Sequence, residues 1–156
     1  MNDSIESRGT VQIICEHVDG HKDEIVVKNT VLQKGRRAMA RALTNNIGDS
    51  FQFYVTRMLF GDGGTNDGVK KYVDASRTGL FGVTRLSKPV VSAVDSNVPE
   101  IAIFTSVIKF DEIVGVTINE MALQMADTDL YSMTTFADLV KTEDIQLTFN
   151  WYIHYV

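Results

Sequence analysis

Cysteine is almost absent from the sequence, since Cys15 is the single thiol among 156 residues. A lone cysteine excludes an intramolecular disulfide and cannot supply the ligand set of a structural zinc site. We therefore expect a chain made in a reducing cytoplasm, in which Cys15 is a partly buried free thiol.

Long apolar runs are also missing. No window approaches the ~18 apolar residues needed to span a bilayer, and the polar start MNDSIESRGT lacks the apolar segment of a signal peptide. The 15 Lys and Arg residues are outnumbered by 20 Asp and Glu residues, which gives a formal charge of −5. This balance gives no general attraction to nucleic acid or anionic lipid. We expect a soluble protein with no membrane partner and no nucleic-acid partner.

Proline is scarce as well, with only Pro89 and Pro99, and no glycine- or serine-rich linker or internal repeat divides the chain. A chain of this length fits one domain, which buries roughly 70% of the surface of the unfolded chain. We predict a flexible arm at residues 1–9 and a single domain at residues 10–156.

Alternating apolar residues are abundant and indicate β-strands. Two β-branched runs, at residues 11–15 and 24–28, flank Asp19 and Gly20, which predicts a hairpin. The segments EIAIFTSVIKF and IQLTFNWYIHYV alternate with a period of two. The second of these predicts a long, half-buried antiparallel strand. Its apolar face consists of Ile145, Leu147, Phe149, Trp151, Ile153 and Tyr155.

One segment, NTVLQKGRRAMARALTNNIG at residues 29–48, has helical periodicity. Its apolar stripe contains Leu32, Gly35, Met39, Ala42 and Leu43. We expect Asn29 or Thr30 to cap its start and Asn45, Asn46 and Gly48 to end it. Together these patterns predict a mainly β (α+β) fold, an antiparallel β-sandwich with one amphipathic helix packed on it.

The helix carries a cluster of cations, Lys34, Arg36, Arg37 and Arg41, which is the candidate partner-binding site. Three interpretations are open: a solvated helix face whose charge suits the C-terminal end of the helix dipole, a surface for an acidic protein, or a contact with nucleic-acid phosphates.

Glu120 lies where the apolar phase of one segment reverses. Val114, Val116 and Ile118 share one phase, whereas Met121, Leu123 and Met125 share the opposite phase. Such a reversal requires an extra residue, so we predict a β-bulge near Asn119 and Glu120, or a change in which face is covered. Glu120 is interpreted as a structural acid of the bulge, paired with an arginine or a backbone amide. The alternative is a role in hydrolysis.

The loop FGDGGTND at residues 60–67 has the composition of a binding site. A phosphate-binding P-loop requires lysine after its last glycine, but Val69 follows Gly68. The loop also lacks the ligand spacing of an EF-hand. We therefore interpret Gly61, Asp62, Gly63 and Gly64 as a structural turn with glycines at positive φ. An irregular divalent-cation site at Asp62, Asn66 and Asp67 is the alternative.

No other pattern indicates catalysis. His17, His21 and His154 are the only histidines, and none belongs to a metalloprotease motif. His17 and His21 would share a face only on a helix, whereas their region reads as a hairpin, so we expect a satisfied or exposed pair. No nucleophile elbow is present. We predict no catalytic residue, no metal and no cofactor.

The order of short motifs resembles a known family. MLFGDGG at residues 58–64, TGL at residues 78–80 with Arg85, and NEMAL at residues 119–123 follow one another. This series resembles the amino-terminal module of tail-collar fibre proteins of tailed bacteriophages and the small stand-alone virion proteins built on the same plan. Ala122 stands where that family usually has glycine.

The resemblance implies a structural protein of the virion, made in the cytoplasm of the host bacterium, that attaches at the tail, baseplate, collar or neck. It also implies a structural turn at the glycine loop, no catalytic activity, and multiple symmetric copies that contact other virion proteins. Two alternatives are a capsid decoration protein and a carbohydrate-binding module, although nothing in the spacing of the residues favours a host glycan.

Overall fold

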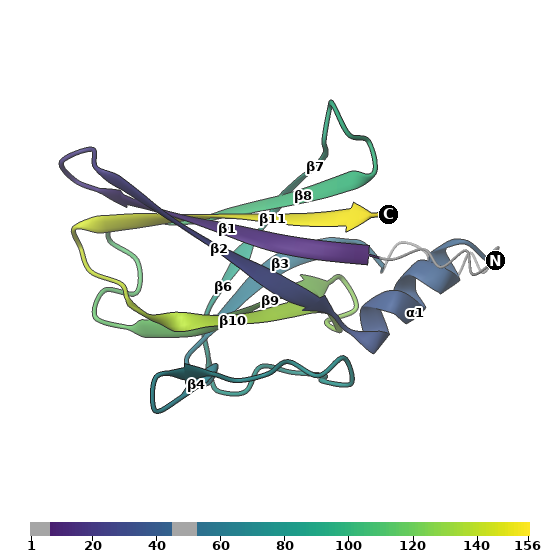
Figure 1. Ribbon diagram of the computed structural model, residues 1–156, viewed down its shortest axis with the longest axis horizontal. Coiled ribbons are helices and arrows are strands. Elements are labelled where there is room, and N and C mark those ends of the chain that lie inside the picture. The colour runs from purple at the N-terminus through teal and green to yellow at the C-terminus, as the bar shows by residue number, and fades with distance from the viewer. Residues whose placement is uncertain (1–6, 45–52) are drawn as a thin grey trace.

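The computed structural model describes residues 7–44 and 53–156, which form eleven strands and one helix (Figure 1). The elements are β1 (Ser7–His17), β2 (Lys22–Val31), α1 (Gln33–Ala42), β3 (Val55–Gly61), β4 (Thr65–Asn66), β5 (Val69–Lys70), β6 (Thr84–Pro89), β7 (Val91–Val94), β8 (Ile101–Ile108), β9 (Thr117–Met125), β10 (Leu130–Val140) and β11 (Ile145–Tyr155).

The predicted amino-terminal arm falls partly outside the described residues. Residues 1–6 are not described, but Ser7–Gly9 belong to β1, where Ser7 pairs with Tyr155 of β11. The boundary at residue 9 was therefore wrong. A strand at this position gains hydrogen-bond partners from β11 that are far away in the sequence.

Nine strands form one antiparallel sheet in the order β6-β3-β9-β10-β2-β1-β11-β8-β7. The predicted hairpin is confirmed, because β2 pairs with β1 over most of its length. The end of β2 then pairs with β10 through Thr30 and Val31. Figure 1 shows β2 crossing from the half that contains β1, β11 and β8 to the half that contains β9 and β10. A single strand thus joins the two halves of the sheet.

The other ends of the sheet also approach each other. β6 and β7 lie at opposite ends of the strand order but are separated in the chain only by Val90, whose backbone N donates to Thr56 O at 3.1 Å. The sheet is therefore nearly closed around its core. Within the described residues the mainly β class and the single helix are confirmed, but the sheet is continuous, and two separate layers of a sandwich are not established.

Buried apolar side chains from both halves fill the interior. The predicted alternation of β11 is confirmed, because Leu147, Phe149, Trp151 and Ile153 are fully buried while the intervening residues are partly exposed. The ring of Phe149 packs on that of Phe60 from β3, with centroids 4.6 Å apart. This contact links the two halves of the sheet across the core.

The helix packs on the sheet with its first two turns only. Leu32, Gly35 and Ala38 are buried, whereas Leu43 is 90% exposed and Ala42 is exposed, so the end of the predicted stripe was wrong. Gly35 is needed for close packing, because a Cβ there would lie 2.4 Å from Tyr131 O. The helix leaves the sheet after these contacts, which is why its last apolar residues lose their cover.

The predicted helix caps also differ from the structure. Leu32 occupies the N-cap, and no side chain of the described residues forms a capping hydrogen bond there. Asn29 and Thr30 are strand residues of β2, so neither is free to cap. Asn45, Asn46 and Gly48, which were predicted to end the helix, lie outside the described residues.

The apolar phase reverses along β9 because both faces of the strand are covered, and an irregular pairing with β10 lies at the same place. Every residue from Ile118 to Leu123 is buried, so both faces of this strand are covered. In addition, Glu120 pairs with Thr135 while Ile118 pairs with Leu139, which shifts the register opposite Asn119. The position of the irregularity was predicted, but the additional residues lie on β10 and not on β9.

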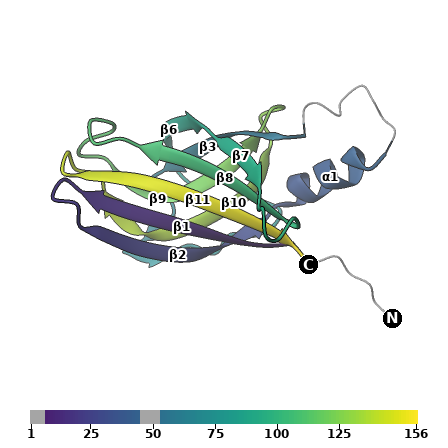
Figure 2. The same cartoon turned by 90° about the horizontal axis from the view of Figure 1, so that it is seen from above.

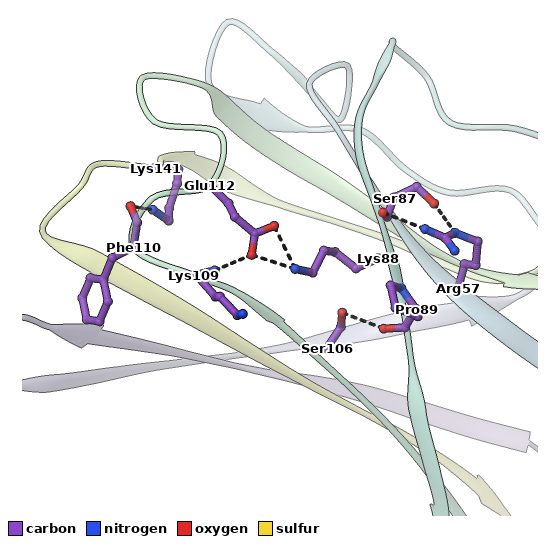
Figure 3. A network of polar contacts seen from close by, with 9 residues as sticks. All are labelled: Arg57, Ser87, Lys88, Pro89, Ser106, Lys109, Phe110, Glu112 and Lys141. Carbon is purple, nitrogen blue, oxygen red and sulfur yellow. Dashed lines mark hydrogen bonds and ion pairs between the residues drawn. The ribbon is translucent and has the colours of Figure 1, made fainter.

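A polar network fastens the loop after β8 to β6 (Figure 3). Lys88 Nζ donates to both carboxylate oxygens of Glu112, at 2.7 and 2.8 Å, and Lys109 N donates to Glu112 Oε1 at 3.1 Å. The hydrogen bond from Lys88 is the main reason why the pKa of Glu112 is lowered. This network joins two segments that belong to opposite halves of the sheet.

Lys141 lies beside this network and is fully buried (Figure 3). Its Nζ donates to Phe110 O at 2.9 Å and to Thr142 O at 2.8 Å. Burial lowers the pKa of the ammonium group, while nearby Glu112 and Asp111 oppose that shift. No sequence pattern indicated that Lys141 would be buried, because lysine is ordinarily exposed.

Candidate functional site: the glycine loop and the exposed helix

The glycine loop follows β3 and is shaped by close contacts between backbones. Positive φ angles occur at Gly20, Gly68 and Gly115 among the described glycines, but not in the loop at Gly61, Gly63 or Gly64. The prediction that these loop glycines adopt positive φ angles was therefore wrong.

The loop glycines instead provide space. A Cβ on Gly63 would lie 2.2 Å from Gly82 N, and a Cβ on Gly64 would lie 2.3 Å from Asn119 O. Both distances are shorter than nonbonded atoms tolerate, so any side chain would force two backbone segments apart.

The carboxylate of Glu120 binds backbone amides of the glycine loop and of the segment at residues 81–82, and we call this contact the Glu120 anchor. Oε1 accepts hydrogen bonds from Gly63 N at 2.9 Å and Gly82 N at 2.8 Å, and Oε2 accepts one from Phe81 N at 2.7 Å. The residue is 0% exposed. Hydrogen bonds from amides to a carboxylate are charge-assisted and offset the cost of burying it. The carboxylate that was considered for hydrolysis thus has three of its about four acceptor positions occupied by backbone amides.

Asn119 extends this anchor to the next residues of the loop. Its Oδ1 accepts from Gly64 N at 2.6 Å, and its Nδ2 donates to Thr65 Oγ1 at 3.0 Å and to Asp138 Oδ1 at 2.9 Å. The hydrogen bond from Thr65 and then that from Asn119 lower the pKa of Asp138. Sequence reasoning named Asn119 as a bulge position and as part of the NEMAL motif, but not as a hydrogen-bond partner of the glycine loop.

Asp62 pairs with Arg85, whose Nε donates to Asp62 Oδ2 at 2.6 Å. Asp62 Oδ1 also accepts from Val83 N at 3.3 Å. Asn66 and Asp67 are exposed at the β4–β5 turn, where Asp67 has a φ of +49°. Within the described ranges, neither Asp62 nor Asp67 belongs to a group of three close His, Cys, Asp or Glu ligands. The irregular cation site gains no support.

The four helix cations differ in their contacts: Lys34 and Arg41 contact other side chains, whereas Arg36 and Arg37 face solvent. Lys34 Nζ lies 2.6 Å from Asp129 Oδ1, and the Arg41 guanidinium lies 4.9 Å from the centroid of the Phe53 ring. Arg36 and Arg37 are exposed, and no ion pair joins them to the part of the chain that the structure describes. The two arginines are thus the cations of this cluster that remain available to a partner.

A shallow groove of about 590 Å³ lies where β2 and β10 separate. The two strands pair only through Thr30 and Val31, and the segment after β5 forms the other wall of the groove. Its lining includes Lys28, Lys70 and Tyr72, and Tyr72 is 83% exposed. Sequence reasoning missed this groove because its walls come from three distant segments.

The hairpin histidines lie together, contrary to the prediction that only a helix would bring them to one face. His17 Nε2 and His21 Nε2 each lie 3.0 Å from the carboxylate of Asp23. The tight turn between β1 and β2 folds the two histidines onto the same side. His154, the third histidine, is in β11.

Within the described residues, no helix is both long and apolar enough to cross a membrane. Comparisons of the chain with protein-family models, with curated proteins and with solved structures found no match.

Proposed function

We propose that this protein is a structural component of a tailed-phage virion, an attachment module of the tail, baseplate, collar or neck that has no catalytic activity. The observation that carries the proposal is the anchor at Glu120. Gly63 of the glycine motif donates a backbone hydrogen bond to this side chain, and so do Phe81 and Gly82, which directly follow the TGL motif. Arg85, which accompanies TGL in the resemblance, pairs with Asp62 of the glycine motif.

Because these hydrogen bonds meet at one side chain, a single structural role explains why the motifs occur together. The loop amides of Gly63 and Gly64 are bound to Glu120 and Asn119, so these two amides do not bind a phosphate or an oxyanion. The glycine motif, the TGL segment and the Asn119-Glu120 pair thus act as one framework, which is the role that the family resemblance implies. We also propose that the two halves of the nearly closed sheet act as the layers of the sandwich that the sequence patterns predict.

Docking requires surfaces that the framework leaves exposed. Arg36 and Arg37 project from α1 on a protein whose net charge is −5. A local basic patch on an acidic protein orients the subunit toward an acidic neighbour and increases the rate of association. Many symmetric copies would then turn modest single contacts into a stable assembly.

The proposal is tested in particles of the phage that encodes the chain. Heads and tails are separated, and the copy number of the protein in each fraction is measured by quantitative mass spectrometry. We expect a fixed copy number in the tail fraction. Presence on heads alone would favour capsid decoration, and complete, infectious particles without the protein would refute a structural role.

A charge-reversal variant tests the docking surface. Arg36→Glu with Arg37→Glu should reduce incorporation about tenfold at low salt, with a smaller difference at high salt because exposed charges are screened. The matched control is Lys22→Glu with Lys70→Glu, which changes the net charge equally at exposed positions elsewhere. Equal loss of incorporation in both variants would show that net charge matters and that the helix surface does not.

A further inference from the structure

The tip of the β1–β2 hairpin gathers side chains that commonly bind metals. Cys15 and His17 are two residues apart on β1, and His21 and Asp23 are two residues apart across the start of β2. Residues two apart in an extended strand face the same side. Cys15 and Asp23 are also direct partners in the β1–β2 pairing. All four side chains therefore lie on one face of the hairpin.

The turn itself is tightly defined. His17 N donates to His21 O at 2.8 Å, Gly20 N donates to His17 O at 2.9 Å, and Gly20 has a φ of +88°. Asp19 Oδ1 accepts a hydrogen bond from His21 N at 2.9 Å. These contacts fix the backbones of both histidines, and the contacts of both rings with Asp23 place the ring centroids 5.1 Å apart. The two imidazoles are thus positioned before any ligand binds.

The donor atoms have the spacing of a metal coordination shell. His17 Nε2 lies 3.0 Å from Asp23 Oδ2, His21 Nε2 lies 3.0 Å from Asp23 Oδ1, and the three ligand atoms lie within 4.8 Å of one another. Tetrahedral ligands that are each ~2.0–2.1 Å from zinc are about 3.3 Å apart. Small side-chain rotations would therefore bring all three atoms to one ion.

We propose that His17, His21 and Asp23 bind a first-row divalent transition metal ion of the zinc class. Two imidazole nitrogens with one carboxylate suit such an ion, whereas calcium and magnesium prefer oxygen ligands. The metal replaces the hydrogen bonds that now join the two Nε2 atoms to Asp23, and each imidazole binds it through an Nε2 that carries no proton. The fourth position is open to water. Cys15 Sγ lies 3.9 Å from His17 Nε2 but not within 4.8 Å of all three ligand atoms, so it stays outside the ligand set.

The site is accessible and separate from the docking surface proposed above. The side chains of His17, His21 and Asp23 are 33%, 61% and 58% exposed, so an ion reaches them directly from solvent. Figure 1 and Figure 2 show the hairpin tip and α1 at opposite ends of the long axis of the molecule. The inference therefore stands independently of the function proposed for the helix.

The experiment is a calorimetric titration of the untagged protein with ZnCl₂, together with visible absorption spectra of the Co²⁺ form. We expect one ion per chain and the intense visible bands of tetrahedral Co²⁺. His17→Asn, His21→Asn and Asp23→Asn should each weaken binding by more than about tenfold. Circular dichroism checks that each variant keeps the fold, as expected for substitutions of exposed side chains.

Two control variants make the result specific. His154→Asn removes the remaining histidine of the chain and should leave the affinity unchanged. Cys15→Ser should change the affinity by less than about twofold, because Cys15 Sγ does not lie close to all three ligand atoms. The proposal is overturned if the wild-type protein shows no saturable binding, if the three ligand variants bind as the wild type does, or if His154→Asn weakens binding equally.

Discussion

At the scale of single residues, Glu120 shows how a carboxylate can be buried without a cation beside it. Three backbone amides from Gly63, Phe81 and Gly82 surround it, and no arginine or lysine hydrogen bonds to it among the described residues. The same arrangement explains the loop glycines, since the amides reach the carboxylate only if the backbones come close together. One side chain thus determines the path of two loops.

Replacing Glu120 by glutamine tests this role. Glutamine keeps one acceptor oxygen but places an NH₂ group against an amide donor, so a charge-assisted hydrogen bond is lost and a buried donor is left unpaired. We expect Glu120→Gln to lower the free energy of unfolding by about 1.5–3 kcal/mol, measured by urea denaturation.

The matched control for this variant is Glu143→Gln at an exposed site, which should change stability by less than about 0.5 kcal/mol. A Glu120→Gln protein as stable as the control would contradict the anchoring role of the carboxylate.

At the scale of elements, β11 organises the fold. It pairs with β1 along one edge and with β8 along the other, so the last strand of the described chain lies beside the first. Its inward face packs in the centre of the core, where Trp151 is fully buried. The indole Nε1 has no hydrogen-bond partner within the described residues, which indicates that packing and not polar contact holds this ring.

Trp151→Ala should therefore destabilise the protein by ~3–5 kcal/mol, because it removes a large buried ring and leaves a cavity. Trp151→Phe should cost less, since it keeps most of the apolar volume and removes the unpaired Nε1. Chemical denaturation measures both values. The fluorescence of Trp151 in the wild type should be blue-shifted and shielded from quenchers; red emission that is fully quenchable would disprove its burial.

At the scale of the whole molecule, closure of the sheet depends on contacts between its two ends. Lys88 of β6 and Glu112 of the loop after β8 form one such contact, and their side chains are only 20% and 25% exposed. The folded protein lowers the pKa of Glu112 below its ordinary value of 4.5, mainly through the hydrogen bond from Lys88. The unfolded chain therefore binds the proton more tightly than the folded protein does.

This difference predicts how stability varies with pH. The contribution of Glu112 is fully present above pH 4.5 and disappears as the pH falls through the lower pKa of the folded protein. Glu112→Gln should cost about 1–2 kcal/mol at pH 7 and make unfolding less sensitive to acid below pH 4.5. Urea denaturation at several pH values measures both effects, and Glu143→Gln is the control. Parallel pH profiles for wild type and Glu112→Gln would contradict the assignment.

The sequence by itself determined the elements whose signal is local. The β1–β2 hairpin follows from two β-branched runs around Asp19 and Gly20, and the buried face of β11 follows from strict alternation. The helix was also predictable from its period. In each case the interactions that favour the element act between residues a few positions apart, so a short window of sequence contains them.

The tertiary structure decided everything that depends on distant partners. Leu32 is the N-cap because Asn29 belongs to strand β2. The extra residues of the bulge lie on β10, where the pairing with β9 shifts its register. Likewise, the amides that bind Glu120 and the Asp23 carboxylate that joins the two histidines come from other segments or across a turn. These outcomes follow from chain closure over long separations, which local propensity does not encode.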